Sequence, residues 1–105
     1  MAKGAIRILK KLPGEPWRWE VIDNTLEALQ KAVDGPIECV NIGGGDVLIC
    51  NEEGKLRGMD KNILFRLEIF VGPVLCAGTD GEEFTDCPIN MQAWLAKNSI
   101  ELQEA

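Results

Sequence analysis

The stretch DNTLEALQKAVDGP has the clearest helical pattern in the chain, and it limits what can surround it. Asn24 suits the N-cap position, and Glu27 three residues later completes a capping box. One apolar stripe recurs at helical spacing and is made by Leu26, Leu29 and Val33. The glycine and proline at the end of the stretch stop the helix. Because a short helix gains most of its stability from burying one face, the pattern predicts a helix packed on a sheet.

Strand patterns precede this helix. Residues 6–12, IRILKKL, alternate in part between apolar and basic residues, which predicts a strand. Residues 17–22, WRWEVI, alternate cleanly, and one face is made by Trp17, Trp19 and Val21. The intervening LPGEP has the chemistry of a turn. The two strands should therefore form a hairpin.

More strand patterns follow the helix. IECVNI (37–42) and VLIC (47–50) predict two strands joined by the glycine-rich turn GGGD. VLIC is apolar throughout, which predicts a central strand covered on both faces. The run LEIFVGPVLCAG (67–78) contains Pro73, which cannot donate to a sheet, so we expect a bulge or an edge there. EEFTDC (82–87) predicts a short strand.

The remaining segments complete the predicted fold. Residues 55–66 have no clean period and predict a long loop with one helical turn. A second helix is expected near residues 88–97, with Pro88 at its first position and a stripe of Met91, Trp94 and Leu95. The following SIELQEA should fray. We therefore predict one α+β domain over residues 1–105, in the order β-β-α-β-β-loop-β-β-α. Its mainly antiparallel sheet has five or six strands, with one helix packed on a face and a second helix near the C-terminus.

Histidine and tyrosine are absent from the sequence. Their absence removes the commonest general base, the Ser-His and Cys-His pairs, and every zinc site that uses histidine. Free and mostly buried thiols are expected, because no C-x-x-C pair occurs among Cys39, Cys50, Cys76 and Cys87. The acidic pairs at 52–53 and 82–83 lie in predicted turns, as solvated carboxylates do. An enzyme would have to use a carboxylate, a lysine or a cysteine, so we predict a non-enzymatic protein without catalytic residues, metal or cofactor.

The net charge of -6 is unevenly distributed, because the first twenty residues carry +3 and the rest carry -9. General nucleic-acid binding needs a basic face and is not expected of this chain. No apolar run approaches the roughly 20 residues of a membrane span, and the start has no signal-peptide pattern. We expect a cytoplasmic protein without membrane contact.

Two groups of residues are candidates for ligand binding. Four cations lie within twelve residues of an acidic protein, at Lys55, Arg57, Lys61 and Arg66. They indicate either an anion or partner surface, or a solvated loop whose cations balance nearby carboxylates. Trp17 and Trp19 form either a base-stacking platform or part of the core. The triple glycine at 43–45 lies between strands rather than before a helix, which favours a hairpin turn over a phosphate cradle.

Several stretches of the chain look like one known family, namely IRILKKLPGEP, IDNTLEALQKAVDGPIE, VLICNEEGKLRG and IFVGPVLCAGTDGEEF. Over roughly residues 5–86 they resemble the small family of phage, prophage and Firmicutes proteins known as domain of unknown function 3846. The runs NEEGKL and VGP carry most of the likeness. The resemblance implies a small stand-alone α+β domain, often in mobile-element gene neighbourhoods. It implies no established activity and no catalytic residue.

Two functional hypotheses follow. The first is a non-enzymatic binding protein of phage or mobile-element origin that counters host defence by sequestering a nucleotide signal in the host cytosol. In it, the basic segment contacts phosphate and a tryptophan stacks on the base. The alternative is an interaction module or inhibitor that binds a host protein through an acidic face or a sheet edge. Homo-oligomerisation through a free sheet edge is also expected.

Overall fold

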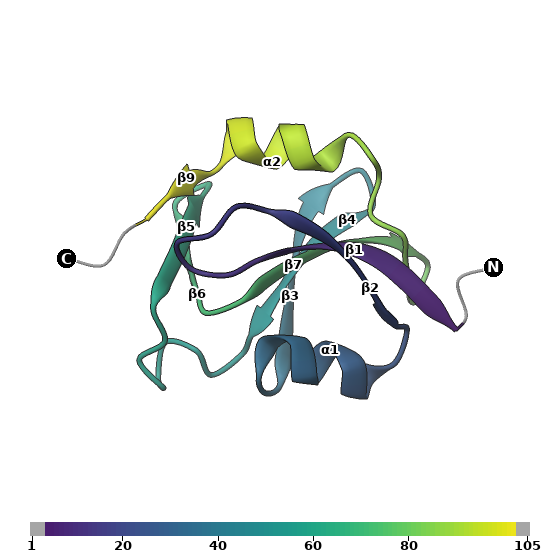
Figure 1. Cartoon of the computed structure of the whole chain (residues 1–105), viewed down its shortest axis with the longest axis horizontal. Coiled ribbons are helices and arrows are strands. Elements are labelled where there is room, and N and C mark those ends of the chain that lie inside the picture. Colours follow the sequence, from purple (N-terminus) through teal and green to yellow (C-terminus); the bar gives the residue numbers. More distant parts are fainter. Residues whose placement is uncertain (1–3, 103–105) are drawn as a thin grey trace.

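The chain folds into two antiparallel sheets and two helices, in a computed structural model that describes residues 4–102 (Figure 1). The strands are β1 (Ala5–Lys11), β2 (Arg18–Asp23), β3 (Ile37–Gly43), β4 (Asp46–Asn51), β5 (Lys61–Phe65), β6 (Glu68–Val71), β7 (Val74–Asp80), β8 (Glu83–Thr85) and β9 (Ile100–Glu101). The helices are α1 (Leu26–Val33) and α2 (Met91–Asn98). The large sheet has six strands in the order β2-β1-β7-β4-β3, with β8 also paired to β7. The α+β class and the mainly antiparallel six-stranded sheet are confirmed, and a small sheet, β6-β5-β9, adds to them.

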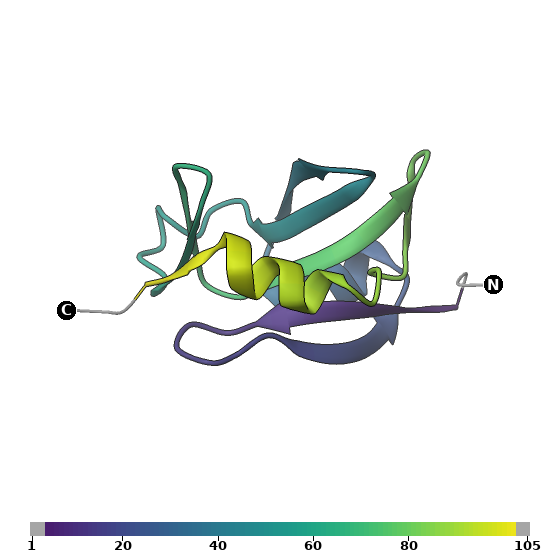
Figure 2. The same ribbon diagram turned by 90° about the horizontal axis from the view of Figure 1, so that it is seen from above.

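The large sheet is covered on both faces, because neighbouring residues of its inner strands point in opposite directions. Ile8 of β1 packs with Leu29 and other residues under α1, whereas the adjacent Leu9 packs with Leu95 of α2 on the other face. Figure 1 shows α1 and α2 on opposite sides of the strands. In Figure 2, which looks onto the face under α2, the β5–β6 hairpin lies beside the end of the helix where β9 begins. The predicted covered position of β4 is confirmed, since Val47 to Asn51 are all buried.

Hairpins form where the sequence predicts them. β1 and β2 pair in antiparallel register with Leu9 opposite Trp19. Gly44 and Gly45 connect β3 to β4 with φ values of 65° and 83°, which L side chains rarely adopt. This left-handed geometry is that of a tight hairpin turn, so the expected turn is confirmed.

Helix α1 begins one residue later than predicted. Its N-cap is Thr25, whose Oγ1 accepts a 3.1 Å hydrogen bond from the backbone N–H of Ala28. Asn24 instead donates its side-chain amide to the carbonyl of Phe84 at 3.1 Å, so the predicted capping box with Glu27 is wrong. Both residues are good caps, and the tertiary contact to β8 decides between them. The buried stripe of α1 does not include Leu26 as predicted, because this side chain is 56% exposed.

The segment expected to be a loop contains a strand. Residues 52–58 form turns, but β5 then pairs with β6 as a hairpin, so the loop prediction for 55–66 is wrong at 61–65. The register shifts between Lys61 and Ile63, which makes Asn62 a bulged residue, and this polar side chain is fully buried. Because Asn62 is polar and yet buried, the sequence of β5 does not show the alternation that predicts a strand. The predicted bulge or edge at Pro73 is also wrong, because the chain there leaves the small sheet and enters the large one.

The C-terminal region is more ordered than predicted. Helix α2 begins at Met91, after Asn90, rather than at Pro88. Ile100 and Glu101 form β9 and pair with β5, so the expectation that this segment frays is wrong for these two residues. It is also wrong for Ser99, which caps α2, and for Leu102, whose N–H donates to the carbonyl of Asn62. The rest of that prediction, at 103–105, lies outside the described residues. The four thiols are free as expected, and all are buried except that of Cys39.

Candidate functional site

Lys11 is a buried lysine at the end of β1. It lies two residues after Leu9 and therefore points to the same face of the sheet, under α2. Its side chain is only 4% exposed. A buried ammonium group is stable only when anionic or dipolar partners replace the water that it has lost.

Two side chains supply those partners. The Nζ atom of Lys11 lies 2.6 Å from Oε1 of Glu101 in β9 and donates to Oδ1 of Asn62 in β5 at 2.7 Å. The amide nitrogen of Asn62 donates to the backbone carbonyls of Lys11 at 2.8 Å and Gly72 at 2.7 Å. The backbone carbonyl of Asn62 also accepts from the N–H of Leu102 at 2.9 Å. These contacts join β1, β5, β9 and the link between β6 and β7 around one buried charge.

A cavity of about 290 Å³ opens beside this network. It is lined by Lys11, Pro16, Trp17, Gln92, Ala96, Ser99 and Glu101. The walls are largely apolar, and the polar groups of Lys11 and Glu101 lie together on one side. A mostly apolar cavity with a few convergent polar groups is the usual form of a small-molecule site. We call it the Lys11 pocket.

Gln92 holds one wall of the Lys11 pocket in place. Its amide nitrogen donates to the carbonyl of Trp17 at 3.0 Å, and its Oε1 accepts from the indole N–H of Trp19 at 3.1 Å. Helix α2 is therefore fastened to the start of β2 at two points. These two hydrogen bonds hold helix α2 against Trp17 and Trp19.

The two tryptophans predicted as a pair have different surroundings. Trp17 is 7% exposed, belongs to the core and also lines the Lys11 pocket. Trp19 is partly buried, with the guanidinium carbon of Arg7 5.0 Å from its ring centroid. The predicted apolar face of this strand ends there, because Val21 is 68% exposed. Only Trp17 of the pair lies against the pocket.

Two of the predicted cations are engaged in separate contacts. Lys55 forms an exposed ion pair with Glu68, with Nζ 2.8 Å from Oε2. Arg57 donates to the backbone carbonyl of Asp34 at 2.6 Å and to its carboxylate at 3.1 Å. Asp34 ends α1 in the left-handed conformation with φ of 64°. Arg57 therefore clamps the loop after β4 to the end of a helix.

The other two predicted cations lie on the β5–β6 hairpin. Arg66 donates to the carbonyl of Ile42 at 3.1 Å, and its guanidinium carbon lies 4.8 Å from the ring centroid of Phe65. Lys61 begins β5 and is exposed. Lys55, Arg57 and Arg66 therefore have different partners, and none of the four cations lines the Lys11 pocket.

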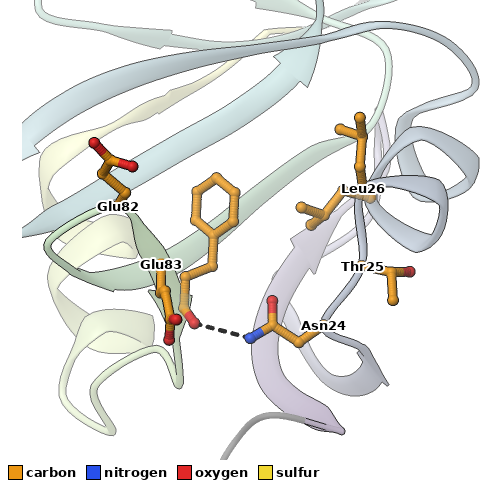
Figure 3. A pocket seen from close by; sticks show the side chains of 7 residues that line it. Asn24, Thr25, Leu26, Glu82 and Glu83 are labelled. Atoms are coloured by element: carbon orange, nitrogen blue, oxygen red, sulfur yellow. Dashed lines mark hydrogen bonds between the residues drawn. The ribbon is translucent and has the colours of Figure 1, made fainter.

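A second cavity, of about 370 Å³, lies where α1 begins beside the β7–β8 hairpin (Figure 3). Figure 3 shows the hydrogen bond from Asn24 to the carbonyl of Phe84, with Glu82 and Glu83 on the hairpin side. Both carboxylates are exposed as expected, but only Glu82 lies in the predicted turn, because Glu83 begins β8. This cavity contains no buried charge, unlike the Lys11 pocket.

Sequence reasoning missed Lys11, Asn62 and Glu101. The register of the first strand does carry a signal, since Lys11 lies two residues after Leu9 and so shares its buried face. The partners carry no such signal, because β9 is too short to form a pattern and Asn62 lies on a bulge. Only the folded chain brings these residues together.

Comparison with protein families gives one match, to the model described as domain of unknown function (DUF3846), over residues 6–99. The chain belongs to the DUF3846 family. The matched residues include Lys11 and Asn62 and end just before β9, which supplies Glu101. No curated protein and no solved structure matches this DUF3846 chain significantly.

The described part of the DUF3846 chain, residues 4–102, contains no cluster of three or more metal-ligating side chains. Within the same residues, neither helix is long and apolar enough to cross a membrane.

Proposed function

We propose that this DUF3846 protein is a non-enzymatic binding domain that captures a small anionic ligand carrying a planar ring, such as a nucleotide, in the Lys11 pocket. One observation carries the proposal: Lys11, whose side chain is buried, and Trp17 line the same cavity of about 290 Å³. Tryptophan faces stack on planar rings, and lysine is a common partner of phosphate and carboxylate groups.

The network around Lys11 supports exchange of one anion for another. An ammonium group has three N–H donors, and Asn62 and Glu101 occupy two of them. Glu101 is 41% exposed, so its carboxylate can turn toward water while Asn62 stays fixed in the core. A ligand anion that replaces this carboxylate keeps the buried charge neutralised. The proposal therefore predicts binding that competes with Glu101.

The size of the cavity limits the ligand. Pockets for small molecules usually span about 300–1,000 Å³, so a cavity of about 290 Å³ suits a nucleoside or mononucleotide. A larger signal, such as a cyclic dinucleotide, would place one base in the pocket and the rest outside. We further propose that the protein acts in the cytoplasm of a host cell and comes from a phage or mobile element, where capture of a nucleotide signal would blunt host defence.

A thermal-shift screen against mononucleotides, cyclic dinucleotides, cyclic oligonucleotides and ADP-ribose derivatives tests this function. A ligand at one hundred times its dissociation constant should add about 2.7 kcal/mol to the free energy of unfolding. Ala96→Phe places a ring into the pocket from an exposed position of α2 and should abolish the response. Ala93→Phe is the matched control, because Ala93 is exposed on the same helix and does not line the pocket.

The outcomes separate this site from the basic segment. If Lys55→Met with Arg57→Met abolishes binding and Ala96→Phe does not, the ligand binds the basic segment instead of the pocket. A panel without any response counts against nucleotide capture.

The alternative function, a protein-interaction module, is supported by a different surface beside β6. Self-association through β2 or β3, the outer strands of the large sheet, stays a prediction.

A further inference from the structure

A groove of about 210 Å³ runs between the small sheet and the large sheet. All four residues of β6, Glu68–Val71, line it, whereas β3 contributes the alternate residues Glu38 and Val40. Successive side chains of a strand point to opposite faces. Four consecutive lining residues therefore mean that β6 presents its edge to the groove, whereas β3 presents one face.

The outer edge of β6, on the side away from β5, has no strand paired to it in the part of the chain that the structure describes. The small sheet has the order β6-β5-β9, so β6 pairs with β5 on one side alone. A free sheet edge carries N–H and C=O groups that can pair with another extended chain. This is the geometry in which proteins bind peptides by adding a strand.

Apolar side chains border this edge at exposed positions. Leu56 is 91% exposed and Ile69 is 40% exposed, and both line the groove. Val40 and Val71 continue the apolar lining and are partly buried. Exposed apolar side chains gathered at one groove indicate an interaction site more than scattered ones do.

The charge around the groove is negative. Its lining includes Glu38, Glu52 and Glu68 against one cation, Lys55, which is already paired with Glu68. Neither Glu38 nor Glu52 has an ion-pair partner within residues 4–102. Burial, followed by the charges of Glu38 and Glu68, raises the pKa of the Cys50 thiol in this groove to about 11. The groove therefore favours a cationic occupant.

We propose that this groove binds an extended segment of a partner protein, with alternating apolar and basic residues, which pairs as a strand with the free edge of β6. The backbone of the segment continues the small sheet. Its apolar side chains contact Ile69 of β6, and its basic side chains on the opposite face of the segment lie toward Glu38 and Glu52. This surface is separate from the Lys11 pocket and shares none of its lining residues.

The test uses the whole protein and a short labelled peptide that alternates valine and lysine. Fluorescence anisotropy should show binding that weakens with salt, and amide NMR shifts should concentrate at Glu68–Val71. The same peptide with N-methyl groups on alternate amides cannot pair along one edge and should bind at least about tenfold more weakly. A peptide that alternates valine and glutamate should not bind.

Charge-reversal variants locate the site. Glu38→Lys with Glu52→Lys should weaken binding of the valine–lysine peptide at least about tenfold and allow the valine–glutamate peptide to bind. Glu82→Lys with Glu83→Lys makes the same charge change on the β7–β8 hairpin and should leave affinity within about twofold at moderate salt.

Three results would overturn the proposal. They are no binding of the valine–lysine peptide to the folded protein, equal binding of its N-methylated form, and equal weakening by the two charge-reversed pairs. A concentration-dependent dimer in sedimentation, with protected amides in β6, would instead assign the groove to a second copy of the chain and also overturn it.

Discussion

The ammonium nitrogen of Lys11 lies 2.6 Å from a carboxylate oxygen of Glu101, and this contact fastens the end of β1 to β9. The two partners are unequally placed, because the lysine side chain is 4% exposed and the glutamate side chain is 41% exposed. Loss of Glu101 therefore leaves the buried ammonium of Lys11 without an anionic partner. Loss of Lys11 would leave a carboxylate that water still solvates. The pair stabilises the fold and also controls one side of the Lys11 pocket.

Glu101→Ala should lower the free energy of unfolding by about 1–3 kcal/mol, because Lys11 loses its anionic partner. The loss should fall below the roughly 3–5 kcal/mol of a fully buried pair, since water screens the exposed carboxylate. Urea unfolding measures the change. Glu68→Ala, which breaks the exposed pair with Lys55, is the matched control and should cost at most about 1 kcal/mol. Equal losses in the two variants would contradict this account.

Asn62→Leu should lower the free energy of unfolding more than Glu101→Ala does, by about 2–4 kcal/mol, although leucine has a similar volume. The variant leaves the carbonyls of Lys11 and Gly72 without their donor, and it removes an acceptor from the buried ammonium. Asn98→Leu is the control, because Asn98 makes one exposed bond to the carbonyl of Trp94. It should change stability by no more than about 0.5 kcal/mol. Similar costs for both variants would mean that the buried amide has no special role.

Thr25→Ala should destabilise the protein by about 1 kcal/mol through loss of the α1 N-cap, and Thr25→Ser should restore most of this. Asn24→Ser tests the competing cap position. A serine at a true N-cap is as good as asparagine, but a serine at 24 cannot donate to the carbonyl of Phe84 as the amide does. Thermal unfolding of the variants decides whether Thr25 or Asn24 is the N-cap. If Asn24→Ser leaves stability unchanged and Thr25→Ser lowers it, the N-cap is Asn24, as the sequence predicts.

A chromogenic disulfide reagent should react quickly with one thiol of the native protein. Cys39 is exposed, whereas Cys50, Cys76 and Cys87 are buried. Burial and Glu38 raise the pKa of Cys39, so its reaction should speed up as pH rises through mildly alkaline values. All four thiols should react in guanidinium chloride. Cys39→Ser should remove the fast phase, and a fast phase that survives in this variant would show that another thiol is accessible.

Alkaline pH should destabilise the fold in part through Cys50. Its folded pKa is raised from 9.0 to about 11, so the folded state holds the proton more tightly than the unfolded state. This stabilisation is fully present below pH 9 and is lost as pH rises from 9 to 11, because only the unfolded state releases its proton in that window. Cys50→Val should flatten the fall in urea midpoint over this window. An unchanged slope would show that other groups cause the alkaline loss.

Local patterns predict the hairpins and α1 well, because their information lies within a few consecutive residues. The helix start shows the limit of such patterns. Asn24 and Thr25 are both good caps, and the contact of Asn24 with Phe84 is made by a strand far along the chain. The same holds for β5, where the bulged and buried Asn62 conceals the alternation of its neighbours.

The sequence predicts the candidate site less well than it predicts the fold. The strand pattern predicts Trp17 as a candidate, and this residue lines the Lys11 pocket. The predicted cations Lys55, Arg57 and Arg66 bind partners whose positions depend on tertiary structure, such as the carbonyls of Asp34 and Ile42. Glu101 reaches Lys11 only because β9 pairs with β5, and no local pattern encodes that pairing.

The placement of β7 between β1 and β4 has a consequence for how fast the protein folds. Leu9 of β1 lies opposite Cys76 of β7, so the centre of the sheet closes only when distant segments of the chain meet. The entropy of closing that loop is lost before the inner strands bury their side chains. Folding should therefore proceed in milliseconds or more slowly, as in other domains dominated by pairing of distant segments. Until β7 is in place, the edge of β1 stays open to pairing with other chains.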